Sequence, residues 1–326
     1  MNFKNRLLIF LLACLFIPFS VFAYSNQVIL GGDNIGIQIN SKGVMIVGFY
    51  KVNGNYIGSD AGLEIGDVII TINDNSITNV EELVDNLDKS NKEININIGI
   101  IRNNKPKDIP LKLIKDDNNI YKTGIYVKDQ ISGIGTLTYL DPKTKIFGAL
   151  GHEIIEKSSG KRLDILKGKI FKSEITNIER GSNGTPGEKT AVLHNEEILG
   201  NITKNTNKGI FGKYNDILEN ELIEVASKNE ITLGKAWIRT VINGTKIDSF
   251  TINILKINYN NDVKNILFEI TDQNLIKQTG GVIQGMSGSP IIQNEKLIGA
   301  VTHVIVNDAV KGYGIFIETM LEEGEN

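Results

Sequence analysis

Cysteine and histidine are scarce in this chain. Its 326 residues include one cysteine and three histidines. The cysteine, Cys14, lies in an apolar N-terminal segment, so the rest of the chain can form neither an internal disulfide nor a cysteine-based metal site. This argues against redox chemistry, and it leaves few candidates for a catalytic base.

A strong charge of either sign is also lacking. The 35 basic and 38 acidic residues give a net charge of -3, and aromatic residues make up only 7%. Such a balance offers no general attraction to nucleic acid. Glycine is frequent, at 33 residues, and short apolar segments rich in Ile, Val and Thr favour strands. The composition predicts a mostly β protein, and the length predicts about two domains.

An uncharged apolar run occupies the N-terminus. The basic segment MNFKNR is followed by residues 7–23 without a charged side chain, which predicts an export signal. The run is slightly shorter than the roughly 20 residues of a membrane span, and it contains Pro18 and Ser20. Cleavage after Ala23 and retention as an anchor both stay open, with retention or late release slightly favoured. We expect residues 1–23 to be a signal peptide or N-terminal membrane anchor and the remainder to be extracytoplasmic.

The segment AGLEIGDVIITINDNSITNVEELVDNL, residues 61–87, combines glycine turns, a strand and a helix. Gly62 and Gly66 mark turns, and Asn79 is expected to cap a helix that begins near Val80. This pattern resembles a PDZ domain, which we place at residues 28–115. The resemblance implies that an extended peptide or chain terminus adds as a strand beside the helix, with its carboxylate held by amides of a glycine-containing loop.

That loop is matched by LGGDNIGIQI, residues 30–39. The alternative for this segment is a plain glycine-rich hairpin turn. The predicted peptide-binding residues are Gly31, Gly32, Asp33, Asn34, Ile35, Gly36 and Ile37.

A second domain is expected after the polar stretch KDDNNIYKTG, residues 115–124. Short β-like segments separated by glycine turns follow over about two hundred residues, which is typical of a sandwich or barrels. We place this domain at residues 120–326.

Within it, GMSGSP, residues 285–290, sets a serine between two glycines and closes the turn with proline. Glycine lets a backbone turn its amides toward an anion. We therefore expect Ser287 to be a nucleophile, with the amides of Gly285 and Ser287 forming an oxyanion hole. A serine hydroxyl needs a general base to act as a nucleophile.

His152 is the leading candidate for that base. It follows an apolar strand in FGALGHEI and precedes Ser287 by 135 positions, 287 minus 152. In a chymotrypsin-like double barrel the base comes first in the chain and the serine last. His194, beside two glutamates, is expected at the surface. His303, on the apolar strand after the nucleophile turn, is expected to be structural or pocket-lining and is the reserve candidate for the base.

The acid that orients the histidine is left open by local sequence. Asp272 ends a β-like run, Asp248 lies further upstream, and a lone aspartate at a strand end is usually a turn residue.

The motifs GHEI, TGGVIQGMSGSP and GAVTHVIVND occur in this order after the PDZ-like segment. Together they resemble the SpoIVB peptidases of endospore-forming bacteria, over nearly the whole chain. The resemblance implies a PDZ domain followed by a chymotrypsin-like double β-barrel serine protease domain. By position it implies His152 as base, Ser287 as nucleophile and Asp272 as acid. Ser289 places a second hydroxyl two residues from the first. No metal and no cofactor is implied.

The resemblance also implies a biological role. Family members are exported from the forespore into the space between the two sporulation membranes. There they cleave themselves and the extracytoplasmic part of a membrane protein, which activates a downstream developmental step. One alternative is a catalytically silent PDZ adaptor or scaffold. Another, a quality-control protease of the HtrA kind, is disfavoured because the PDZ domain here precedes the protease domain.

Overall fold

The computed structural model describes residues 24–89, 94–118, 120–162, 165–216 and 219–325. The predicted signal peptide or anchor, residues 1–23, lies outside the described residues. Among the helices of the described part, none has the length and apolar character needed to cross a membrane.

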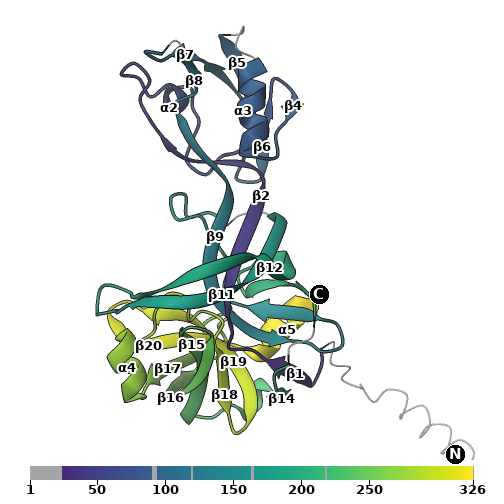
Figure 1. The fold of residues 1–326 in the computed structure, drawn as a ribbon, viewed down its shortest axis with the longest axis vertical. Helices are drawn as coiled ribbons and strands as arrows, with labels where there is room; N and C mark the ends of the chain where they lie inside the picture. The colour runs from purple at the N-terminus through teal and green to yellow at the C-terminus, as the bar shows by residue number, and fades with distance from the viewer. Residues whose placement is uncertain (1–23, 90–93, 119, 163–164, 217–218, 326) are drawn as a thin grey trace, which may run out of the picture.

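The described chain forms two bodies joined by two long strands (Figure 1). These strands are β2 (Asn34–Phe49) and β9 (Ile125–Leu140), which pair antiparallel along most of their length. Their register shifts between the Asn40–Gln130 pair and the Met45–Lys128 pair. This shift separates an upper body, residues 41–130, from a lower body made of residues 24–40 and 131–325.

The upper body packs two helices against short strands around its own apolar core, which includes Ile46, Ile72 and Leu83. Helix α3 begins where the sequence predicts, because Asn79 Oδ1 accepts a hydrogen bond of 2.8 Å from the Glu82 amide. The elements are α2 (Ile57–Asp60), β3 (Val68–Ile72), β4 (Asn75–Ser76), α3 (Val80–Lys89), β5 (Asn95–Arg102), β6 (Lys105–Lys112), β7 (Ile114–Lys115) and β8 (Tyr121–Lys122).

A first barrel occupies the part of the lower body nearer the upper body. Its strands pair in the closed order β9, β2, β11, β12, β13, β10 and back to β9. Alternate side chains point inward, and Ile35, Ile37, Leu137, Phe147 and Ile170 form its core. The remaining strands of this barrel are β10 (Ile146–Ala149), β11 (Ile165–Glu179), β12 (Glu188–Thr206) and β13 (Gly209–Tyr214).

A second barrel follows in the chain, with the closed order β15, β16, β17, β20, β19, β18 and back to β15. It has a separate apolar core around Ile238, Phe268 and Val301. Its elements are β15 (Gly234–Asn243), β16 (Lys246–Ile257), β17 (Ile266–Ile270), α4 (Gln273–Thr279), β18 (Pro290–Gln293), β19 (Lys296–Ile305) and β20 (Asp308–Phe316).

Three further elements lie beside the barrels and share a fourth apolar cluster with them. Strand β14 pairs with β1 on one side and with β19 on the other. These elements are β1 (Gln27–Leu30), β14 (Leu222–Val225) and α5 (Ile317–Glu325), and a short 3-10 turn, η1 (Lys228–Glu230), follows β14.

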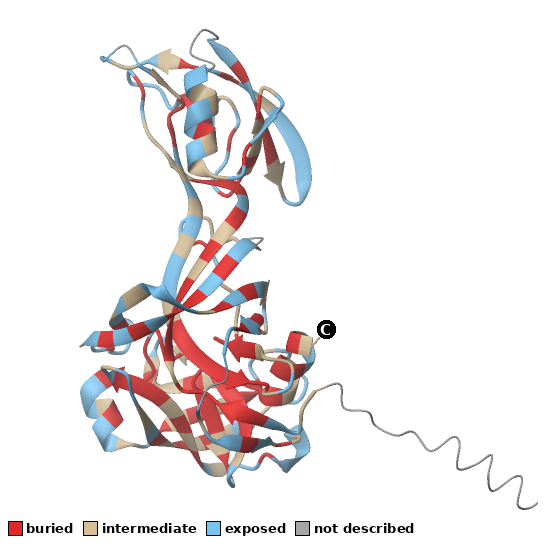
Figure 2. Cartoon of the chain, turned by 45° about the vertical axis from the view of Figure 1, so that its right-hand side comes forward, coloured by how far each residue is buried: buried red, intermediate tan, exposed pale blue. Residues whose placement is uncertain are grey.

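The predicted mostly β fold, with a PDZ-like unit and a double barrel, is confirmed. The two units do not simply follow each other in the chain, because residues 27–40 belong to the lower body. The upper body is thus inserted into the first barrel between β2 and β9. Figure 2 shows buried residues continuing along β2 from one body into the other, whereas residues 126–134 of β9 are exposed or half-buried.

Candidate active site

Ser287 lies in a tight turn between α4 and β18. The turn needs glycine at two positions, since Gly285 has φ +94° and Gly288 has φ +91°. A Cβ atom on Gly288 would also lie 2.0 Å from the Thr136 carbonyl oxygen. Both glycines are therefore required by backbone conformation, as expected for a turn that presents its amides.

The turn distinguishes its two serines. Ser289 is fully buried, and its Oγ has no hydrogen-bond partner within the described chain. Ser287 is half-buried, and its Oγ donates a hydrogen bond of 3.0 Å to the carbonyl oxygen of Thr302 on β19. Only Ser287 can meet a substrate without rearrangement of the barrel.

The turn leaves two of its amides unpaired. Those of Met286, Gly288 and Ser289 donate to the carbonyls of Ile283, Val301 and Met286, respectively. The amides of Gly285 and Ser287 donate to no group of the described residues. The two amides predicted to hold an oxyanion are thus the ones that the fold leaves available.

His152 follows β10 in the first barrel and is half-buried. Its Nδ1 lies 2.8 Å from the carbonyl oxygen of Glu153. A proton on Nδ1 satisfies that contact and leaves Nε2 as the free acceptor, which is the form a general base requires. Burial holds the pKa of His152 below its usual value of 6.5, so the neutral ring is favoured at neutral pH.

The segment that carries His152 packs against the nucleophile turn and β19. A Cβ atom on Gly288 would lie 2.5 Å from the Leu150 amide nitrogen, and one on Gly151 would lie 2.7 Å from Thr302 Cγ2. The fold therefore brings His152 to the region where Ser287 contacts Thr302. No hydrogen bond joins His152 to Ser287 among the described side chains. In this structure the Ser287 hydroxyl donates to the Thr302 carbonyl instead.

His303, the reserve candidate, lies beside His152, with ring centroids 5.3 Å apart and planes 43° apart. Its Nδ1 is buried without a partner in the described chain. Burial, and then the neighbouring His152, lower the pKa of His303 to about 4. A group with so low a pKa is a poor general base at neutral pH.

Asp272 precedes α4 and is its N-cap. Its Oδ1 accepts hydrogen bonds of 3.0 Å from the amides of Asn274 and Leu275. No hydrogen bond or ion pair joins Asp272 to His152 in the described structure. Asp248 pairs with Lys246 at 2.7 Å. The expectation that Asp272 orients His152 therefore stays a prediction, and in this structure the Glu153 carbonyl takes the position beside Nδ1.

Comparison with known protein families gives two matches. The family described as SpoIVB peptidase S55 matches residues 119–321, and the PDZ domain family matches residues 34–113. The first match covers more than half of the chain. The chain belongs to the SpoIVB peptidase family. It is a serine endopeptidase with a PDZ domain, and the upper body corresponds to most of the PDZ match.

Solved structures resemble this peptidase only distantly. The inactive form of the Rv3671c protease has 13% identity and a TM-score of 0.34, covering 59% of this chain and 82% of that chain. The active form of this M. tuberculosis protease has 11% identity and a TM-score of 0.35, covering 60% and 73%. A search of curated proteins gave no match.

The role of Asp272 can be separated from its capping of α4. Asparagine caps helices about as well as aspartate, so Asp272→Asn should leave the melting temperature nearly unchanged. If the carboxylate orients His152, as the family resemblance implies, the substitution should lower the rate of acylation about 10⁴-fold. Labelling with a fluorophosphonate probe and thermal unfolding measure the two effects. A variant labelled as fast as wild type would leave Asp272 with the capping role alone.

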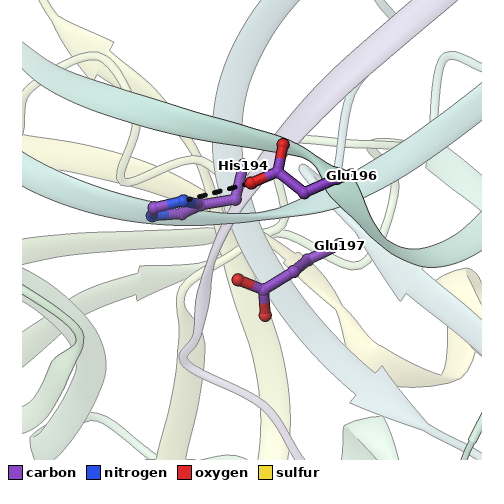
Figure 3. A group of neighbouring side chains, drawn as sticks. All are labelled: His194, Glu196 and Glu197. Carbon is purple, nitrogen blue, oxygen red and sulfur yellow. Dashed lines mark ion pairs between the residues drawn. The ribbon is translucent and has the colours of Figure 1, made fainter.

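His194, Glu196 and Glu197 form a surface cluster on β12, shown in Figure 3. His194 Nδ1 lies 3.9 Å from Glu196 Oε1, and the glutamate side chains are 78% and 48% exposed. Lys172 Nζ lies 3.0 Å from Glu197 Oε2. Lys172 already neutralises part of the cluster. The two glutamates are exposed on β12, and His194 is half-buried beside them.

The predicted peptide-binding loop of the PDZ domain lies elsewhere in the structure. The amides of Gly31 and Gly32 donate to the carbonyls of Thr138 and Leu137, and Ile35 and Ile37 belong to the core of the first barrel. These backbone groups cannot hold a peptide carboxylate. The prediction for residues 31–37 is corrected on this point, because β2 enters the barrel instead of folding back within the PDZ domain.

Strand β9 takes the place beside the PDZ helix. Residues 125–128 pair with β2 along one edge, and no strand of the described chain pairs with the other edge. At the start of α3, the Val80 amide donates a hydrogen bond of 2.9 Å to Asp129 Oδ2. We call residues 125–129 the β9 edge. It begins after Gly124, whose φ is +70°.

Proposed function

We propose that this serine endopeptidase is a sporulation-signalling enzyme, exported across the forespore membrane and held there for a time by residues 1–23. It cleaves itself and the extracytoplasmic part of a sporulation membrane protein, which activates a downstream developmental step. The support is the family membership over residues 119–321, combined with a turn in which Ser287 is half-buried and the amides of Gly285 and Ser287 are unpaired within the described chain.

The geometry supports an acyl-transfer mechanism. On substrate binding, the Ser287 hydroxyl turns from the Thr302 carbonyl toward His152 Nε2, which accepts its proton as Oγ attacks the peptide carbonyl. The amides of Gly285 and Ser287 stabilise the oxyanion. His152 then donates the proton to the leaving amine, and water hydrolyses the acyl-enzyme by the same route. The Glu153 carbonyl holds the ring of His152 in the required tautomer.

Two measurements on purified protein test this assignment. Wild type is expected to react with a fluorophosphonate probe and to cut its own N-terminal region, and Ser287→Ala is expected to do neither. Ser289→Ala is the matched control, because Ser289 is buried and should not be the labelled residue. Self-cleavage that persists in Ser287→Ala would contradict the assignment.

The target can be sought in sporulating cells. Mass spectrometry of membrane proteins from cells with wild-type protein and with Ser287→Ala should identify extracytoplasmic fragments that depend on the serine. If wild type has no dependent fragment and is not labelled by the probe, the silent PDZ adaptor becomes the better description. Degradation of unfolded casein by wild type would instead favour a quality-control protease.

The PDZ domain supports binding of a protein segment, and we place that binding at the β9 edge. Its backbone groups face no other strand of the described chain, so an extended peptide can add there as a further strand. Val84 lies one turn after Val80 on α3, and its side chain is 48% exposed. An exposed valine on the helix that adjoins β9 offers an apolar contact for a peptide side chain.

Val84→Arg should therefore weaken peptide binding about ten-fold or more, because it puts a charge where an apolar contact is expected. The probe is a pool of fluorescent heptapeptides with an apolar last residue and a free carboxylate, and anisotropy measures its affinity. The same pool with amidated ends reports whether the carboxylate contributes. Asp85→Arg, at the neighbouring exposed position, is the matched control. Equal affinities of the two variants would place the peptide elsewhere.

A further inference from the structure

The nucleophile turn belongs to the second barrel but is held by the first. Thr136, on β9, is fully buried, and its Oγ1 donates a hydrogen bond of 2.9 Å to the Gly285 carbonyl oxygen. Its amide donates a hydrogen bond of 2.9 Å to the Ser287 carbonyl oxygen. One threonine thus fixes the carbonyl groups of both residues whose amides remain unpaired.

Lys189, at the start of β12, contacts the same glycine from another direction. A Cβ atom on Gly285 would lie 2.9 Å from Lys189 Cδ and 3.2 Å from its Cβ and Cγ. The side chain is buried, with 1% exposed, and Nζ donates a hydrogen bond of 2.9 Å to Thr240 Oγ1. No carboxylate of the described chain pairs with it. Lysine is almost never buried without an ionic partner, so its position calls for an explanation.

The backbone of Lys189 also holds the peptide unit between Gln284 and Gly285. Its amide donates a hydrogen bond of 3.0 Å to the Gln284 carbonyl oxygen. That carbonyl and the Gly285 amide belong to one planar trans peptide unit, so they point in opposite directions. Anchoring the carbonyl on β12 therefore aims the Gly285 amide away from β12. The lysine stem, held at its end by Thr240, limits any movement of Gly285.

We propose that Thr136 and Lys189 are positioning residues that hold the Gly285 amide in the direction needed to bind the oxyanion. The Gly285 amide has to be held by its surroundings because Gly285 has φ +94° and its amide donates to no group of the described chain. Its orientation depends on its carbonyl, on the preceding peptide unit and on packing. Thr136 and Lys189 supply these three constraints. The inference rests on the proposed function, since it concerns the acylation of Ser287.

The test uses the full chain and a fluorophosphonate probe at increasing concentration, which separates the maximal labelling rate from the apparent probe affinity. Thr136→Val is expected to lower the maximal rate at least about ten-fold, since loss of one oxyanion donor costs about 10²–10³-fold. The apparent affinity should change less than about two-fold. Thr136→Ser, which retains the hydroxyl, should recover most of the rate.

Thr138→Val is the matched control. Thr138 is also a buried threonine of β9, and its Oγ1 donates a hydrogen bond of 2.8 Å to the Gly288 carbonyl oxygen. Gly288 is anchored in addition by its own amide, which donates to Val301. The loss of rate should therefore be smaller than for Thr136→Val. Equal losses in the two valine variants, or a loss confined to probe affinity, would overturn the proposal.

Lys189 is tested by shortening and by replacement with an uncharged side chain of similar length. Lys189→Ala removes the stem and should lower the maximal rate about ten-fold, whereas Lys189→Met keeps the stem and should recover most of it. Thermal unfolding identifies a variant that does not fold. If a Lys189 variant does not fold, the comparison of Thr136→Val with Thr136→Ser tests the proposal. A wild-type protein that is not labelled would overturn the proposed function, and this inference with it. A labelled wild type with Thr136→Val and Thr136→Ser equally fast would overturn the inference alone.

Discussion

Replacing His152 by glutamine is expected to slow the labelling of Ser287 by a factor on the order of 10⁶. Glutamine is similar in size but cannot accept the proton of the serine hydroxyl. The carbonyl of Glu153 and the segment beside Gly288 would remain in place, so loss of the base is the main change. Fluorophosphonate labelling measures the rate, and thermal unfolding checks that the barrel is intact.

His303→Gln is the matched control, because the two rings lie beside each other. His303 has a pKa lowered to about 4, which makes it a poor base at neutral pH, so its replacement should cost less than about ten-fold. A collapse of labelling in His303→Gln, with His152→Gln little affected, would exchange the two assignments.

The same assignment fixes the pH dependence of labelling. The ring must be neutral to accept a proton, so the rate should fall as pH decreases through the pKa of His152. Burial holds that pKa below 6.5, and the midpoint of the acid limb should therefore lie below 6.5 as well. Measuring the labelling rate of wild type from about pH 4.5 to about pH 8 locates the midpoint.

The sequence was informative wherever the signal was local. Short β-branched segments between glycine turns predicted a mostly β protein, and the Asn79 cap and the Gly285–Ser287 turn were recognisable from neighbouring residues. The path of β2 could not be recognised from neighbouring residues. An alternating strand has the same pattern whether it pairs in the PDZ domain or in a barrel, so residues 31–37 were assigned to the wrong body.

The supports of the site were also invisible in the sequence. Thr136 contacts Gly285 across 149 positions of the chain, and no pattern connects the two. Lys189 would be expected to point to solvent, as lysines in strands usually do, yet both barrels enclose it. For Asp272 the sequence suggested a role that the structure does not show. Family position matches it to the catalytic acid, whereas its carboxylate caps the N-terminus of α4.

Lys189→Met is expected to raise the free energy of unfolding at neutral pH, by an amount on the order of a few kcal/mol. Burial lowers the pKa of Lys189 from 10.5 to about 7, and no carboxylate of the described chain offsets the cost. Methionine fills much the same volume without a charge to desolvate. The native packing against Gly285 should survive, because the stem is retained.

The pH dependence of this gain follows from proton binding. Between pH 7 and pH 10.5 the unfolded chain holds a proton on Lys189 that the folded chain does not, so the wild-type free energy of unfolding rises with pH in that window. A shift from 10.5 to about 7 corresponds to on the order of 5 kcal/mol across the window. Below pH 7 the cost is present in full.

The advantage of Lys189→Met should accordingly be largest near pH 7 and shrink toward pH 10. Urea unfolding of both proteins at several pH values gives the difference directly, so that other titrating groups cancel. Lys169→Met, at an exposed position of β11, should show no such trend. A constant difference between wild type and Lys189→Met would mean that Lys189 stays charged in the folded protein. Its ammonium would then have to be stabilised between the barrels, where the Thr240 hydroxyl is its one hydrogen-bond partner among the described residues.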